Sequence, residues 1–213
     1  MNRGEILQRI KLILGFKVGT VFDNDINTQI QQAQLELEQE AELPDFLKKA
    51  YTGLSTVAST QTVSCPADFI REFDDDQLFL RNTDNEETPV VADQRGFLRQ
   101  RYPISDGTGT PKGYDIINKV FYFYPIPDAV YSIQGTYYGS DTTLSADAST
   151  NFWSTLIPEI LVSKAGFVIA SGLRDQIAMQ DFAGMLGRAT QKLNERNTSN
   201  EAAGSKPVAG GED

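Results

Sequence analysis

The segment from Gly113 to Trp153 constrains the fold of this chain more than any other. Aromatic and β-branched residues fill Tyr114–Ile117 and Val120–Tyr124, and after a Pro-x-Pro-Asp interruption they fill Tyr131–Tyr138. Such runs, bounded by Pro and Gly, are typical of paired strands. A polar loop and a long apolar helical pattern follow. The middle of the chain is therefore predicted to be rich in β-structure and to be followed by helices.

Both ends of the chain show helical periodicity. Apolar residues recur at helical spacing over Glu5–Leu14, from Asp23 to Pro44, from Ser154 or Thr155 to Gly172, and from Arg174 onward. Gln, Glu and Asn form the other face of the second helix, which we expect to face water. Residues 197–213 are rich in Gly, Ala, Ser and Asn without periodicity, which is typical of a flexible tail.

Between these helices the chain switches to short strand-like runs. We expect a helical turn over Asp45–Tyr51, a hairpin of Leu54–Ala58 with Gln61–Cys65, strands at Gln77–Arg81 and Thr88–Ala92, and a helix over Asp93–Tyr102. The predicted fold class is α+β, with an α-helical bundle from the N- and C-terminal helices and an inserted antiparallel β-rich lobe. The predicted bounds are 1–53 and 151–196 for the bundle, 54–150 for the lobe and 197–213 for the tail.

Composition excludes several common kinds of site. The chain has no histidine, which removes Ser-His-Asp and Cys-His catalysis and every metal site that contains His. Its one cysteine, Cys65, cannot form an intrachain disulfide, which suits a reducing cytosol. No apolar run approaches the ~18 residues that span a bilayer. We therefore expect no catalytic residue, no cofactor, no metal and no membrane partner.

Two sequence motifs suggest a ligand but have simpler interpretations. Asp74, Asp75 and Asp76 resemble a cation site or a carboxylate pair, yet adjacent strand residues point to opposite faces, and a solvated acidic edge explains them. The Gly-rich segment 107–113 resembles a phosphate loop. However, its lysine is followed by Gly and then by a strand, so a turn into that strand is the better interpretation.

Charge is segregated along the middle of the chain. Residues 68–93 are strongly acidic, and a basic stretch follows them. A closed ring of identical subunits needs two different surfaces that meet, and segregated charge suits such a contact, although two ordinary solvated faces explain it equally well. Some of the aromatic residues of 121–138 can also face a neighbouring subunit. The candidate subunit-interface residues are Asp74, Asp75, Asp76, Arg95, Arg99, Arg101, Tyr137 and Tyr138.

A series of short motifs occurs in an order known from one family. These motifs are Pro66-Ala67-Asp68-Phe69, Thr108-Gly109-Thr110-Pro111, Tyr124-Pro125-Ile126-Pro127-Asp128, Tyr137-Tyr138, Leu144-Ser145 and Asn151-Phe152-Trp153. In this order, over about residues 45–196, the chain resembles the head-to-tail adaptor (neck or connector) proteins of tailed bacteriophages.

The resemblance implies a structural virion protein without enzymatic activity. Such adaptors form a ring, typically of twelve copies, in the neck below the portal protein, after assembly in the host cytoplasm. The ring extends the DNA channel and binds the tail or stopper protein, and genomic DNA passes without specific binding. The C-terminal segment of these proteins usually contacts the portal, so the portal-docking candidates are Asn197, Lys206 and Asp213.

Two other classes of function stay open at this point. One is a tail-associated carbohydrate hydrolase, which would need two carboxylates converging in a cleft. Its candidates are Asp74, Asp76, Asp115 and Asp128, and nothing in the sequence pairs them. The other is a different neck component, such as a stopper or tail terminator, although those proteins are usually β-rich.

Overall fold

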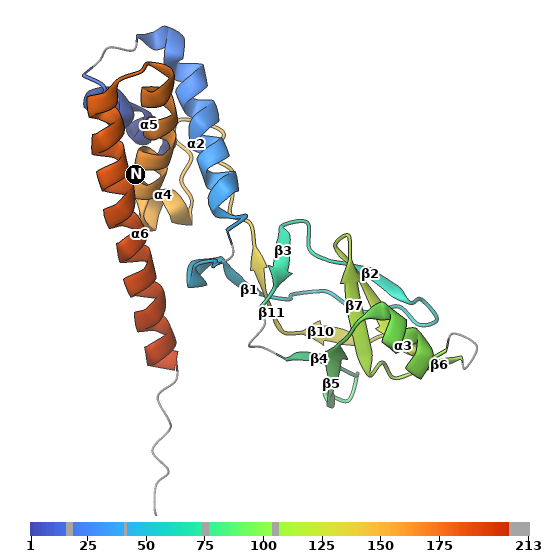
Figure 1. The fold of residues 1–213 in the computed structure, drawn as a ribbon. Coiled ribbons are helices and arrows are strands. Elements are labelled where there is room, and N and C mark those ends of the chain that lie inside the picture. The colour runs from blue at the N-terminus through green and yellow to red at the C-terminus, as the bar shows by residue number, and fades with distance from the viewer. Residues whose placement is uncertain (16–18, 41, 74–76, 104–106, 205–213) are drawn as a thin grey trace, which may run out of the picture. The chain divides into compact units, whose positions relative to one another are not determined.

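The computed structural model describes residues 1–15, 19–40, 42–73, 77–103 and 107–204, with side chains up to residue 198 (Figure 1). The chain divides into two compact units. The helical unit comprises Met1–Phe46 and the residues from Asp141 onward, and the β unit comprises Leu47–Ser140. Because helices dominate one unit and strands the other, the fold is α+β, as predicted. The β unit begins and ends earlier in the sequence than the lobe expected at 54–150.

The helical unit is built around one central helix. It contains α1 (Arg3–Ile13), η1 (Thr20–Phe22), α2 (Asp23–Leu37), α4 (Phe152–Leu156), α5 (Pro158–Gly172) and α6 (Gln176–Gly204). α5 packs against α1, α2, α4 and α6, and Figure 1 shows it between α2 and α6. Buried apolar side chains from these helices form the core, among them Ile6, Ile10, Ile26, Ile30, Leu161 and Phe182.

The helix expected to start at Ser154 or Thr155 is in fact two helices. Asn151 caps α4, since its side chain accepts the N–H of Ser154 at 2.9 Å. Pro158 is the first residue of α5, and a proline disfavours helical backbone at the residue before it. Ile157 accordingly has φ −143° and separates α4 from α5.

Two other helix ends differ from the sequence-based prediction. α2 ends at Leu37, before the expected stop at Pro44. α6 continues through Asn197 to Gly204, into the segment that was expected to be a flexible tail. Residues 205–213 lie outside the described part of the chain.

Gly166 allows α6 to lie close to α5. A Cβ atom at Gly166 would lie 2.3 Å from the ring of Phe182, which is fully buried. We expect Gly166→Ala to lower the free energy of unfolding by about 1–3 kcal/mol through overpacking, although alanine is the better helix former by about 1 kcal/mol. Gly187→Ala is the matched control, because nothing lies within 4 Å of its Cβ position, and it should be neutral or stabilising. Urea unfolding measures both changes, and equal effects would contradict this packing argument.

The described residues of the β unit form three sheets. One has the order β1 (Lys48–Ala50), β11 (Thr136–Gly139), β3 (Phe69–Glu72). The largest has the order β10 (Ser132–Gln134), β4 (Leu78–Arg81), β5 (Glu87–Ala92), β7 (Gly113–Ile117), β8 (Val120–Tyr124), β2 (Thr62–Ser64). The third pairs β6 (Thr108–Gly109) with β9 (Ile126–Pro127). All neighbours are antiparallel except β5–β7 and β6–β9. η2 (Asp45–Leu47) precedes β1, and α3 (Arg95–Arg101) follows β5.

The aromatic segment forms one hairpin, and the strands that follow this hairpin pair elsewhere. β7 and β8 pair around Asn118 and Lys119, whose positive φ angles suit a two-residue hairpin loop. Beyond the Pro-x-Pro-Asp turn, the run expected as one strand over Tyr131–Tyr138 is two strands, β10 and β11, in different sheets. Gly135, with φ +151°, lies between them. The strands on either side of the Pro-x-Pro-Asp turn therefore do not pair with each other.

Two further predictions in the β unit are wrong. The expected hairpin of Leu54–Ala58 with Gln61–Cys65 is reduced to a single bridge, because β2 pairs with β8, where Val63 packs against the aromatic core. The expected helical turn over Asp45–Tyr51 is only η2, followed by β1. The aromatic core itself is made by Tyr51, Phe69, Tyr114, Phe121, Phe123, Tyr131 and Tyr137.

Candidate interaction surfaces

The arginine-bearing helix is present as α3, and its three arginines differ in exposure. Leu98 is buried and anchors α3 on β7, where Gly113 leaves room for it: a Cβ atom there would lie 2.4 Å from the Leu98 side chain. Arg95 is half-buried with its guanidinium 4.3 Å from the centre of the Tyr122 ring, a cation–π contact. Arg99 and Arg101 are exposed. Two of the three predicted arginines are thus free to meet a partner.

Tyr137 and Tyr138 mainly fill their own unit. Tyr137 is only 5% exposed and stacks on Tyr51 with ring centres 4.7 Å apart. Tyr138 is 9% exposed and lies edge-on to Phe73 with ring centres 5.7 Å apart, and the Arg71 guanidinium lies over its ring, 5.2 Å from the ring centre. Consecutive residues of β11 are buried, so both faces of this strand are covered, which alternation alone does not predict. Little of either ring is left for contact with a second copy.

Two of the family motifs, Pro66-Ala67-Asp68-Phe69 and Tyr137-Tyr138, contact each other in the β unit. Asp68 accepts hydrogen bonds from Lys49 Nζ at 2.6 Å and from the Tyr137 hydroxyl at 3.0 Å. Burial alone would raise the pKa of Asp68, but these two hydrogen bonds outweigh it and lower the pKa. Burial and the Asp68 carboxylate raise the pKa of Tyr137 to about 12. Lys49 also donates to the Ser140 carbonyl at 2.8 Å. The cluster joins β1, β3 and β11 at the point where the chain enters and leaves the β unit.

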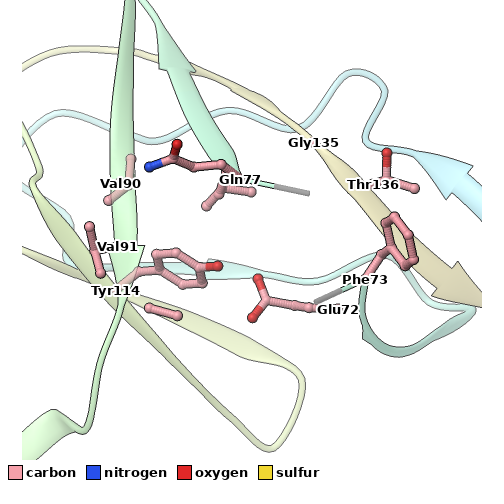
Figure 2. A pocket seen from close by; sticks show the side chains of 10 residues that line it. Glu72, Phe73, Gln77, Val90, Val91, Tyr114, Gly135 and Thr136 are labelled. Carbon is pink, nitrogen blue, oxygen red and sulfur yellow. The ribbon is translucent and has the colours of Figure 1, made fainter. Parts of the chain in front are cut away.

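The acidic triplet Asp74, Asp75 and Asp76 lies outside the described residues. The residues on either side of it, Phe73 and Gln77, line a hollow of about 340 Å³ together with Glu72 and Tyr114 (Figure 2). Across the described residues, no group of three or more Cys, Asp or Glu side chains converges as a metal site would require. A hollow with one described carboxylate gives no basis for assigning a ligand.

Among the described residues, Cys65, Asp115 and Asp128 lie on separate segments of the β unit. Burial, with Glu72 as the next cause, raises the pKa of the Cys65 thiol to about 12, so the thiolate is disfavoured. Asp115 lies in β7, whereas Asp128 follows β9 and accepts the Tyr131 hydroxyl at 2.7 Å. The Gly-rich segment leads through β6 into β7 and opens no helix, as expected for a turn.

A buried polar network in the helical unit was missed by the sequence reasoning. Gln34 and Glu38 of the α2 region were expected on a water-facing surface, but they are only 4% and 6% exposed. Glu38 Oε1 accepts hydrogen bonds from Gln34 Nε2 at 3.0 Å, from the Asp141 backbone N–H at 3.1 Å and from Trp153 Nε1 at 3.2 Å. Asn151 Nδ2 donates to Gln34 Oε1 at 3.0 Å. The network holds the chain where it re-enters the helical unit at Asp141.

The portal-docking candidates fall at and beyond the end of α6. Asn197 lies in the helix, after the last buried described side chain, Leu193, whereas Lys206 and Asp213 lie outside the described part. α6 has 29 residues and α5 has 15. Since each residue adds about 1.5 Å, α6 is roughly 20 Å longer than the helix it packs against.

The sequence profile of a family described as SU10 adaptor protein matches residues 1–209. The match spans almost the whole sequence, so the chain belongs to this family of phage head-to-tail adaptors. The family resemblance seen in the sequence is thus confirmed, and it extends to the N-terminal helices. A comparison with curated proteins finds no match.

Family membership gives the general role of the chain. It is a phage structural adaptor and therefore a virion component, and the family indicates a non-enzymatic role. None of the helices in the described ranges has both the length and the apolar character needed to cross a lipid bilayer.

Proposed function

We propose that this protein forms a ring in the virion neck, between the portal protein and the tail or stopper protein, and that the ring extends the DNA channel. The ring has typically twelve copies, as in other adaptors, and is assembled in the host cytoplasm. The observation that carries this proposal is the family match over residues 1–209.

The charge of the chain supports a channel through which DNA moves freely. The formal net charge is −10 at pH 7. Proteins that hold DNA neutralise its phosphates with Lys and Arg, and an acidic wall cannot do so. Genomic DNA is therefore expected to pass the ring without specific binding.

The end of α6 is the proposed portal-docking arm. Residues after Leu193 add no buried described side chain to the helical unit, so this stretch is not required for its core. The arm includes the candidates Asn197, Lys206 and Asp213. For contacts between subunits, Asp74, Asp75, Asp76, Arg95, Arg99 and Arg101 remain proposed residues, and Tyr137 and Tyr138 have little exposed surface to contribute.

Electron microscopy of the purified protein mixed with its cognate portal tests the proposal. The expected result is a ring of density added to one face of the portal, with a continuous central channel. Portal particles without added density, alongside a protein that stays monomeric, would contradict it. A glycan-hydrolysis screen of the same preparation addresses the hydrolase alternative, for which no turnover is expected.

Ring formation is expected to weaken as salt is raised. Contacts between exposed charged groups are screened over about 8 Å at physiological ionic strength and over about 3 Å at 1 M salt. The measurement is the fraction of protein in rings on portal between 0.05 and 1 M salt, roughly the range over which screening becomes nearly complete. A fraction that does not depend on salt would remove charge as the basis of the subunit contact.

A further inference from the structure

The helical unit carries acidic and basic side chains on opposite sides of its central helix. The acidic set lies at the C-terminal end of α2 and consists of the exposed residues Glu36, Glu40 and Glu42. The basic set lies on α6 and consists of the exposed residues Arg188, Lys192 and Arg196. We call these the α2 acidic end and the α6 basic row.

The position of the two sets around α5 follows from two contacts. Lys164 of α5 reaches the α2 acidic end, with its Nζ 3.5 Å from Glu36 and 3.1 Å from Glu40. Gly166 of α5 faces α6, because its Cβ position lies against Phe182. Two residues along a helix correspond to a rotation of about 200°. α2 and α6 therefore flank α5 on opposite sides (Figure 1).

The two sets also lie at a similar level along α5. Lys192 and Arg196 line a hollow of about 450 Å³ beside Glu159, near the start of α5. The acidic end is paired with Lys164, which is about 8 Å further along the helix axis at 1.5 Å per residue. A rotation about a ring axis can thus bring the basic row of one subunit beside the acidic end of the next.

The acidic end is placed where its own helix does not favour it. Carboxylates near a helix C-terminus oppose the macrodipole, which favours cations there. The last turn of α2 has no basic residue, and the sequence has no Lys or Arg anywhere from Gly19 to Leu47. Lys164 offsets part of this charge from α5. A basic surface on another molecule would offset the rest of the negative charge of the α2 acidic end.

We infer that neighbouring subunits meet head to tail through the helical unit, with the α6 basic row of one copy against the α2 acidic end of the next. This inference rests on the proposed ring and names its contact. The occupant is a second copy because the two complementary surfaces are both present on one chain, on opposite flanks, where they cannot pair with each other. Such a heterologous contact closes into a ring when the rotation between copies is suitable. Complementary charge would also fix the order and register of the subunits.

Charge reversal and charge exchange test this contact in the full-length protein with portal. One variant is Arg188→Glu with Lys192→Glu, and the other is Glu40→Lys with Glu42→Lys. Each alone should reduce ring assembly at least tenfold, because each places like charges in contact. Mixing the two variants in equal amounts should restore rings, since each then offers the other a complementary surface. The chain that carries all four substitutions should assemble by itself.

The controls separate this inference from the proposed ring. Arg9→Glu with Lys119→Glu gives the same change of net charge as the α6 variant at two exposed positions outside both sets and should assemble as the wild type does. Circular dichroism confirms that each variant is folded, and restoration by mixing cannot come from misfolded chains. If wild-type protein forms rings and the reversed variants form them equally well, or mixing restores nothing, the contact is overturned while the ring stands. If wild-type protein forms no ring on portal, the proposed function itself fails.

Discussion

Truncation of the chain after Arg196 is expected to abolish portal binding while leaving both units folded. The deletion removes residues 197–213, which contain the whole proposed docking arm. The last buried described side chain of α6, Leu193, stays in place, and so do Ala178, Phe182 and Ala189. The core of the helical unit should therefore lose little stability. A loss of at least a hundredfold in affinity for portal corresponds to about 2.7 kcal/mol or more.

The measurement is a binding titration of the truncated protein against purified portal, with thermal unfolding as the test of folding. A second truncation, after Gly204, keeps the whole described length of α6 and removes only residues 205–213. If binding is lost only in the longer deletion, the helical end of α6 carries the contact. If both deletions bind the portal as the full chain does, the assignment of the arm is refuted.

Elements with a strong local pattern could be predicted from the sequence. α1, α3, α5 and the hairpin of β7 and β8 occur where periodicity and turn residues indicate them. These signals act within a few residues: a capping residue, an aromatic run bounded by Pro and Gly, or apolar spacing on one helix face. The break at Pro158 has an equally local cause, because a proline restricts the backbone of the residue before it.

Pairing between distant strands could not be predicted in the same way. β2 could pair equally with the run before it or with β8, and only burial of Val63 against the aromatic core favours β8. The division of the last strand at Gly135 likewise depends on β4 and β1 offering edges in two different sheets. For the interaction surfaces, sequence order showed that charges were segregated. It could not show that α2 and α6 lie on opposite sides of α5, because that follows from packing.

The polar network around Glu38 is a further feature that the sequence does not predict, because a buried carboxylate in an otherwise polar helix face has no distinctive sequence pattern. Its burial becomes visible only when Asp141 and Trp153 are placed beside α2. Three N–H donors converge on one oxygen atom of Glu38, at 3.0, 3.1 and 3.2 Å. Loss of this acceptor would leave the Asp141 N–H and the Trp153 Nε1–H without their partner, whereas Gln34 Nε2 also lies 3.4 Å from the carbonyl oxygens of Asp141 and Thr142.

We therefore expect Glu38→Ala to lower the free energy of unfolding by about 3–5 kcal/mol, because each buried unsatisfied polar group costs about 1–3 kcal/mol. Glu38→Gln keeps an acceptor oxygen and should cost about 1 kcal/mol. Glu36→Ala is the matched control on the same helix: Glu36 is exposed, its ion pair with Lys164 spans 3.5 Å, and its loss should cost less than about 1 kcal/mol. Urea unfolding of the three variants gives the comparison. If Glu38→Ala is no more destabilising than Glu36→Ala, the network does not hold the returning chain against α2, and the start of α4 must be fixed by apolar packing of Trp153 alone.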